Sequence, residues 1–175
     1  DWLIERIERL PGPTWAFYAL AFILFIPFYH ALIWLGGNVP FPLTNFILLT
    51  SSMYVVYPLA LYHYLRYVAT RSLAAFRPAL SINDAEYARL EYEFTHIPQI
   101  WALLAVPVGI FAGTGNLLNN LEDGYLLRPD GPVFPFAFSV IMSSFFVVTL
   151  IALLLLVFRQ LVLVSRTHRE ATQLD

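Results

Sequence analysis

The fold is decided by 56 consecutive residues without an acidic or basic side chain, LPGPTWAFYALAFILFIPFYHALIWLGGNVPFPLTNFILLTSSMYVVYPLALYHYL (residues 10–65). A helix that crosses the hydrocarbon core of a bilayer needs about 20 apolar residues, so this stretch is long enough for two crossings. The Gly and Pro residues of GGNVPFP (residues 36–42) interrupt any helix and mark the turn between the two. We therefore predict one span near Trp15 to Leu35 and a second near Leu43 to Leu65.

Two further charge-free stretches, residues 94–121 and 131–158, predict two more spans, near Pro98 to Gly115 and Val133 to Phe158. The composition agrees, because 59% of the residues are hydrophobic and only 13% are charged, against roughly a quarter in soluble domains. Bilayer hydrocarbon offers the backbone no hydrogen-bond partner, and the apolar runs lack the alternation of barrel strands. The predicted fold is therefore all-α: a polytopic membrane protein with four transmembrane helices.

The arginine residues predict how the chain threads the membrane. Nine of the ten Arg lie before the first span, between the second and third, or after the fourth, and only Arg128 lies in the two opposite loops. Basic residues collect on the cytoplasmic side of membrane proteins. We therefore expect a multi-pass protein of the cell membrane, a prokaryotic plasma membrane, with both termini in the cytoplasm.

Two polar segments are predicted to form short interfacial helices beside these spans. The first ten residues form an amphipathic run, and Asn83-Asp84-Ala85-Glu86 has the spacing of an N-terminal capping box. Both helices are expected to lie along the membrane surface, with one face against head groups or protein. The predicted organisation is an amphipathic interfacial segment at 1–14, a first transmembrane hairpin at 15–67, a cytoplasmic linker with a short amphipathic helix at 68–97, a second transmembrane hairpin at 98–158 and a cytoplasmic helical stem at 159–175.

The two predicted hairpins are similar in sequence. A shift of 92 positions lays SSMYVV (residues 51–56) over SSFFVV (residues 143–148), and a shift of 86 sets Trp15 over Trp101. Chance similarity between apolar segments is the alternative, but matched Pro, Trp and paired Ser residues favour an internal duplication. The four spans are therefore predicted to form two tandem helical hairpins of the same orientation.

Polar side chains within the predicted spans are the candidate ligand-binding residues. They are expected at similar depth in the outer half of the membrane and comprise His30, Asn45, Thr50, Ser51, Ser139 and Ser143. Hydrogen bonds between packed helices are the simpler interpretation, and a polar ligand pocket is the alternative. No Asp, Glu or Arg lies within a predicted span, although such residues mark most ion pumps and coupled transporters, so an ion pump is not expected.

A stripe of small residues on the third predicted span indicates close helix packing. Ala105, Gly109 and Gly113 recur every four residues, which lets the backbone of another helix approach. Packing within the chain, against the face that carries Ser139 and Ser143, is preferred here over a dimer seam.

No cofactor and no metal site are predicted, and b-type haem is the cofactor that the composition permits best. The chain has no Cys and no Lys, which excludes disulfides, thiolate metal sites, c-type haem and lysine Schiff bases. His63 and His96 approach the same predicted membrane face and are the candidate haem ligands. Bound lipid or quinone is the other option.

These features favour a non-catalytic membrane module, a sensory or anchoring domain that transmits to a cytoplasmic partner through its last helix. The alternatives are an accessory subunit of a larger energy-converting or transport complex, and a channel or small-solute transporter. No Ser/His/Asp set, phosphate-binding loop or metal motif supports an enzyme. The expected partners are the lipid bilayer and other membrane subunits or a second copy of the chain, whereas the dispersed Arg residues do not form a nucleic-acid patch.

Overall fold

The computed structural model describes residues 2–35, 46–80, 82–119 and 133–172, and every regular element among them is helical, which confirms the all-α prediction. In chain order these elements are α1 (Trp2–Glu8), α2 (Thr14–Leu35), α3 (Phe46–Phe76), the short 3-10 helix η1 (Arg77–Ala79), α4 (Asp84–Thr95), α5 (Gln99–Asn119) and α6 (Val133–Thr172).

Three helical segments are long and apolar enough to cross a membrane: Thr14–Leu35, Asp84–Asn119 and Phe136–Thr167. They contain the predicted first and third spans and all but the first three residues of the predicted fourth span, and they are compatible with a membrane location. The predicted second span, Leu43 to Leu65, begins outside the described residues and continues in α3, which is not among the three segments found in the described part of the chain.

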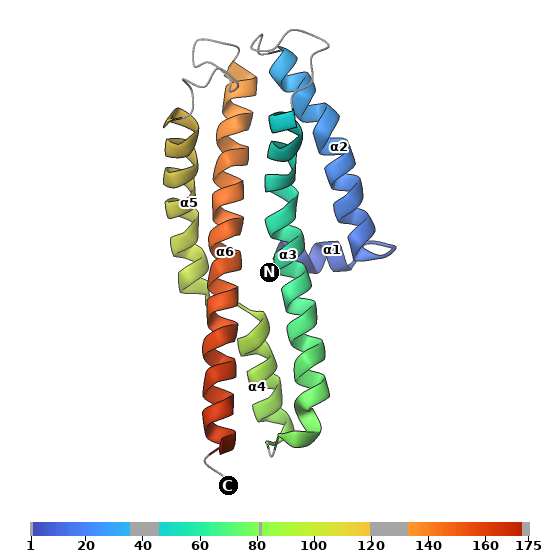
Figure 1. Cartoon of the computed structure of the whole chain (residues 1–175), viewed down its shortest axis with the longest axis vertical. Coiled ribbons are helices and arrows are strands. Elements are labelled where there is room, and N and C mark those ends of the chain that lie inside the picture. Colours follow the sequence, from blue (N-terminus) through green and yellow to red (C-terminus); the bar gives the residue numbers. More distant parts are fainter. Residues whose placement is uncertain (1, 36–45, 81, 120–132, 173–175) are drawn as a thin grey trace.

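The long helices pack side by side, with α6 between α5 and α3 (Figure 1). The contact between α5 and α6 is the most extensive in the described structure, followed by the contacts of α3 with α6 and of α2 with α3. Figure 1 shows that α2 and α5 run in one direction and that α3 and α6 run in the opposite direction. Two further elements, α1 and α4, pack around the lower part of this bundle.

Helix α6 extends far past the end of the predicted fourth span. Its 40 residues correspond to a length of about 60 Å at 1.5 Å per residue, twice the thickness of bilayer hydrocarbon of about 30 Å. No Gly or Pro interrupts it after Pro135. The predicted stem, as far as Thr172, is therefore the continuous extension of the span rather than a separate element.

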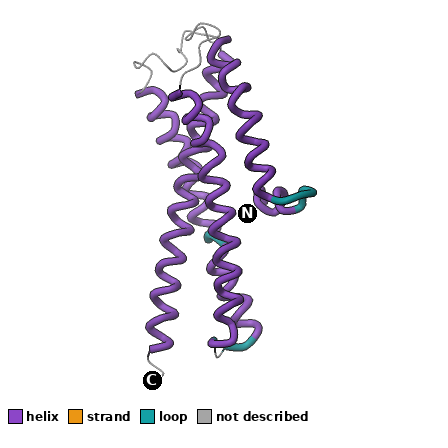
Figure 2. Tube along the Cα trace, turned by 45° about the vertical axis from the view of Figure 1, so that its right-hand side comes forward, coloured by secondary structure: helices purple, strands orange, loops and turns teal. Residues whose placement is uncertain are grey.

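Helix α3 also continues past the end of the predicted second span at Leu65. The first predicted hairpin ended at residue 67, but α3 continues to Phe76. Residues 68–76 hold Ala, Leu, Arg and Ser and neither Gly nor Pro, and the next helix breaker is Pro78. Nine residues that we assigned to the linker thus lengthen α3. Figure 2 shows the lower halves of α3 and α6 continuing beyond the level of α1.

Helix α1 lies across the bundle and buries its apolar face against protein (Figure 1). Ile4 and Ile7 retain only 2% and 4% of their accessible surface. Ile4 packs in one cluster with Tyr62 of α3 and with Leu153 and Leu156 of α6. The amphipathic pattern of the first ten residues therefore reflects contact with α3 and α6 as well as any contact with the membrane surface.

Helix α4 starts with the predicted capping box and runs alongside two longer helices. The Asn83 side chain accepts hydrogen bonds from the backbone of Ala85 and Glu86, and the Glu86 carboxylate accepts one from the Asn83 backbone. Figure 1 shows α4 running alongside the lower halves of α3 and α6. The lower halves of α3 and α6 give Tyr87 and Phe94 of α4 a protein surface to pack against, as the amphipathic pattern of this segment allowed.

Candidate functional site

His63 lies where α1, α2 and α3 meet, and both nitrogens of its buried ring have partners. Nδ1 is 3.0 Å from the Tyr18 hydroxyl oxygen of α2, and Nε2 is 3.1 Å from Oε1 of Glu8 at the end of α1. An ionised carboxylate only accepts hydrogen bonds, so Nε2 carries the ring proton and donates a hydrogen bond to Oε1 of Glu8. In the neutral imidazole, Nδ1 then accepts a hydrogen bond from the Tyr18 hydroxyl.

This Glu8–His63–Tyr18 cluster was only partly visible in the sequence. His63 was recognised as a polar residue near a span end, but Glu8 and Tyr18 were not connected with it. Tyr18 and His63 are 45 positions apart, and no spacing rule links residues on two helices across such a distance. The available signal was that Glu8 belongs to the amphipathic segment at 1–14, one face of which was expected to contact head groups or protein.

The histidines proposed as haem ligands have other partners in the structure. His63 uses both ring nitrogens, as described. His96 has its Nδ1 2.8 Å from the Thr95 hydroxyl oxygen, and its ring stacks on Tyr92 at 4.3 Å between centroids. A haem with two histidine ligands needs one free nitrogen lone pair from each ring, directed at the same iron. The arrangement of His63 does not fit that role.

The polar residues predicted to lie together in the outer half of the membrane make separate contacts in the structure. His30 is buried, and its Nδ1 bonds to the Ile26 carbonyl of its own helix at 2.8 Å. Ser143 of α6 donates to the Gly113 carbonyl of α5 at 2.8 Å. Ser139 is buried on α6, next to Tyr29 of α2. Asn45 and the side chains of Thr50 and Ser51 lie outside the described residues.

The small-residue stripe of α5 faces α6 at close range. Ala105, Gly109 and Gly113 are buried, and Leu117 continues the same face. A Cβ atom added at Gly113 would lie 2.6 Å from Cα of Ser144, and one added at Gly109 would lie 2.9 Å from the backbone nitrogen of Val148. These distances are shorter than van der Waals contact, so the backbones of α5 and α6 approach as closely as they do because these positions lack a side chain.

Two hydrogen bonds join α6 to the end of α4. Nε of Arg159 donates to the Glu93 carbonyl at 2.6 Å, and Nε2 of Gln160 donates to the Phe94 carbonyl at 3.1 Å. Both carbonyls belong to the last turn of α4, where the helix supplies no partner of its own and the helix dipole favours a cation. We call these four residues the α4–α6 joint.

No protein family, curated protein or solved structure matches this chain. The described contacts are therefore the basis for a functional proposal. The contacts at His63, Ser143 and the α4–α6 joint each link one helix to another, and the polar groups there already have protein partners.

Proposed function

We propose that the chain is a non-catalytic membrane module that passes a change in its transmembrane helices to a cytoplasmic partner through α6. In this proposal four spans form two tandem hairpins, which arose by duplication, and both termini lie on the cytoplasmic side of a prokaryotic plasma membrane. The second span runs from about Leu43 to Leu65 and includes the upper part of α3, which begins at Phe46. The strongest support for this topology is the placement of nine of ten Arg residues on one side of the predicted spans.

The observation that carries the transmitting role is the unbroken course of α6 through the bundle. The same helix contacts α5 in its upper half and bonds to α4 in its lower half. A helix without Gly or Pro in its interior is a stiff connector, because each residue adds a backbone hydrogen bond. A rotation or a shift of the membrane-spanning part of α6 along its axis therefore also moves its cytoplasmic part.

The α4–α6 joint supplies the second half of the mechanism. Only three residues, His96 to Pro98, separate the end of α4 from the start of α5. Helix α4 is thus attached to α5 through the chain and to α6 through Arg159 and Gln160. A displacement between α5 and α6 must therefore either move α4 or break these two hydrogen bonds. In a module that only anchors the protein, α5 and α6 would not shift and α4 would stay in place.

The topology is tested by single cysteine substitutions, which are specific because the chain has no native Cys. Leu35→Cys and Asn119→Cys place a thiol at exposed helix ends that we expect on the outer face, and Arg9→Cys and Ser165→Cys place one on the inner face. A membrane-impermeant maleimide added to intact cells should label only the first pair. Labelling of Leu35→Cys and Asn119→Cys from opposite sides would contradict the four-span arrangement.

The transmitting role is tested by distance measurement between nitroxide labels at Ala88 of α4 and Ser165 of α6, both exposed. Gly113→Ala, which forces α5 and α6 apart, should shift the distribution of this distance, and Gly115→Ala should not, because a Cβ there meets nothing within 4 Å. Adding Arg159→Ala and Gln160→Ala should enlarge the shift, because α4 is then attached to α5 alone and follows its displacement away from α6. An unchanged distribution in Gly113→Ala would reduce the proposal to a passive anchor.

One surface of the bundle is where the accessory-subunit alternative can be tested. The face of α5 opposite its stripe is strongly apolar and exposed, with Phe111 at 84% and Leu103 at 68% of their full accessible surface. Lipid covers such a face in a free module, and neighbouring helices, pigments or quinones cover it in a complex. Extraction from native membranes in mild detergent distinguishes the two, because a subunit migrates as an assembly of fixed stoichiometry.

A further inference from the structure

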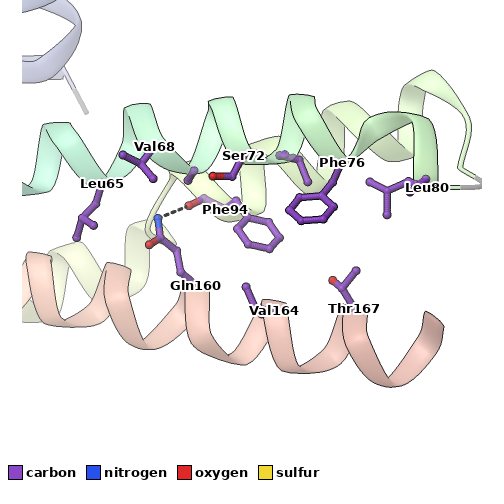
Figure 3. A pocket seen from close by; sticks show the side chains of 12 residues that line it. Leu65, Val68, Ser72, Phe76, Leu80, Phe94, Gln160, Val164 and Thr167 are labelled. Carbon is purple, nitrogen blue, oxygen red and sulfur yellow. Dashed lines mark hydrogen bonds between the residues drawn. The ribbon is translucent and has the colours of Figure 1, made fainter. Parts of the chain in front are cut away.

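A pocket of about 570 Å³ lies between the lower halves of α3 and α6 (Figure 3). Its lining is mostly apolar and includes Leu65, Val68, Phe76, Leu80, Phe94 and Val164. Figure 3 shows the rings of Phe76 and Phe94 between the two helices, with Val164 facing them from α6. The volume falls within the range of about 300–1,000 Å³ that is typical of small-molecule pockets.

The polar side chains of the pocket are largely occupied. Gln160 donates to the Phe94 carbonyl at 3.1 Å, and the Thr167 hydroxyl donates to the Leu163 carbonyl at 2.9 Å. A polar metabolite that entered the pocket would lose its hydration and find few groups to replace it. The lining therefore selects an apolar ligand.

The position of the pocket indicates where such a ligand comes from. In the proposed topology, on which this inference rests, Leu65 and Gln160 lie at the cytoplasmic membrane surface. From there the pocket follows α3 for about 16 Å to Phe76, at 1.5 Å per residue. Phe76 and Val164 keep 66% and 56% of their accessible surface, and apolar surface of this kind outside a membrane usually marks a binding site. A hydrocarbon chain from the inner leaflet reaches this surface without crossing water.

The charges beside the pocket favour an anionic ligand. Residues 64–80 and 159–169, which flank it, contain neither Asp nor Glu but hold Arg66, Arg71, Arg77, Arg159, Arg166 and Arg169. Some of these side chains have protein partners, such as Asp84 for Arg77. Helix α4, which lines the pocket through Phe94, carries four acidic residues and one Arg. The Arg residues of the surrounding segments still outnumber these acidic residues, and this excess of positive charge favours anionic lipid head groups.

We propose that this pocket binds one acyl chain of an anionic membrane lipid. The head group lies at the membrane surface near Arg66, and the chain runs between α3 and α6 toward Phe76. The bound chain then takes the place of a core side chain between the two helices that enter the cytoplasm. It would hold α3 and α6 at a fixed separation next to the α4–α6 joint.

The test uses the full chain, reconstituted in vesicles of equal parts phosphatidylglycerol and phosphatidylcholine and then extracted into mild detergent for native mass spectrometry. The wild-type protein should retain one phosphatidylglycerol per chain. Ala69 lines the pocket, so Ala69→Phe should fill it and lower retention at least tenfold. Ala75→Phe makes the same change at an exposed position of α3 outside the lining and should retain the lipid. If Ala69→Phe does not fold, Val164→Asn, which makes the lining polar, decides instead.

Several results would overturn the proposal. Equal retention by the wild type and the pocket variant would place the lipid elsewhere, and equal retention of phosphatidylcholine would remove the anionic preference. Retention of added oleate but not of phospholipid would assign the pocket to a free fatty acid. A dimer that Ala69→Phe dissociates would assign the groove to a second copy of the chain. The cysteine-labelling pattern is measured separately, so failure here is distinguishable from failure of the proposed topology.

Discussion

The hydroxyl oxygen of Tyr18 lies 3.0 Å from Nδ1 of His63, and this contact ties α2 to α3 at the level where α1 crosses the bundle. Glu8 holds the other nitrogen of the same ring. Helices α1, α2 and α3 are therefore joined through the imidazole ring of His63.

We expect Tyr18→Phe to weaken this junction, because it leaves Nδ1 of a buried His63 without a donor. An unpaired buried polar group costs about 1–3 kcal/mol, so the free energy of unfolding should fall by about 1 kcal/mol. Equilibrium unfolding in mixed detergent micelles measures the change. Tyr64→Phe is the control, because Tyr64 is 60% exposed on the same helix as His63. Equal effects of the two substitutions would show that the hydrogen bond does not stabilise the fold.

Two neighbouring serines of α6 should respond to alanine substitution in different ways. Ser143 donates to the Gly113 carbonyl, whereas the buried Ser144 hydroxyl has no partner in the described structure. A hydrogen bond between membrane helices contributes about 0.6 kcal/mol on average, so Ser143→Ala should destabilise the protein by about that amount. Ser144→Ala removes an unpaired buried hydroxyl and should be neutral or stabilising. Thermal unfolding followed by circular dichroism tests this order, and the reverse order would contradict it.

Gly113→Ala should destabilise the α5–α6 interface, because the new Cβ would lie 2.6 Å from Cα of Ser144. Overpacking of this kind typically costs about 1–3 kcal/mol. Gly115→Ala is the matched control two residues along the same helix, where nothing lies within 4 Å of the new atom. Chemical unfolding of both variants gives the difference. Comparable stability of the two proteins would mean that α5 and α6 are farther apart in the membrane than in this structure.

Asn83→Ala should destabilise the start of α4 by about 1 kcal/mol, because two backbone N–H groups lose their acceptor. Hydrogen exchange should then quicken at Ala85 and Glu86 and stay unchanged in α5. Asn119→Ala, at the exposed end of α5, serves as the control. Unchanged protection of α4 would indicate that packing against α3 and α6, rather than the cap, holds its first turn.

The local signals in the sequence predicted local structure well. The capping box at Asn83 and the uninterrupted course of α6 both depend on residues within a few positions of each other, and both are present. Helix α3 continues past the predicted span end at Leu65, because arginines mark the membrane surface and do not stop a helix. The sequence distinguished where the apolar part ends but not where the helix ends.

The candidate sites were harder to predict, because each depends on residues from separate helices. His63 was singled out without either of its partners, and the pocket beside Phe94 was not foreseen. No periodicity along one helix indicates that α3 and α6 will separate at one end and leave apolar side chains facing each other.

The sequence by itself determined that this chain is helical and that it contains segments suited to a bilayer. Those properties follow from the length of charge-free runs and from the positions of Gly and Pro, which act within a single segment. Only the tertiary structure decided what surrounds His63, which helix meets the glycines of α5 and where α1 and α4 bury their apolar faces. These outcomes depend on the rotation and separation of packed helices, which are set by side chains far apart in the chain.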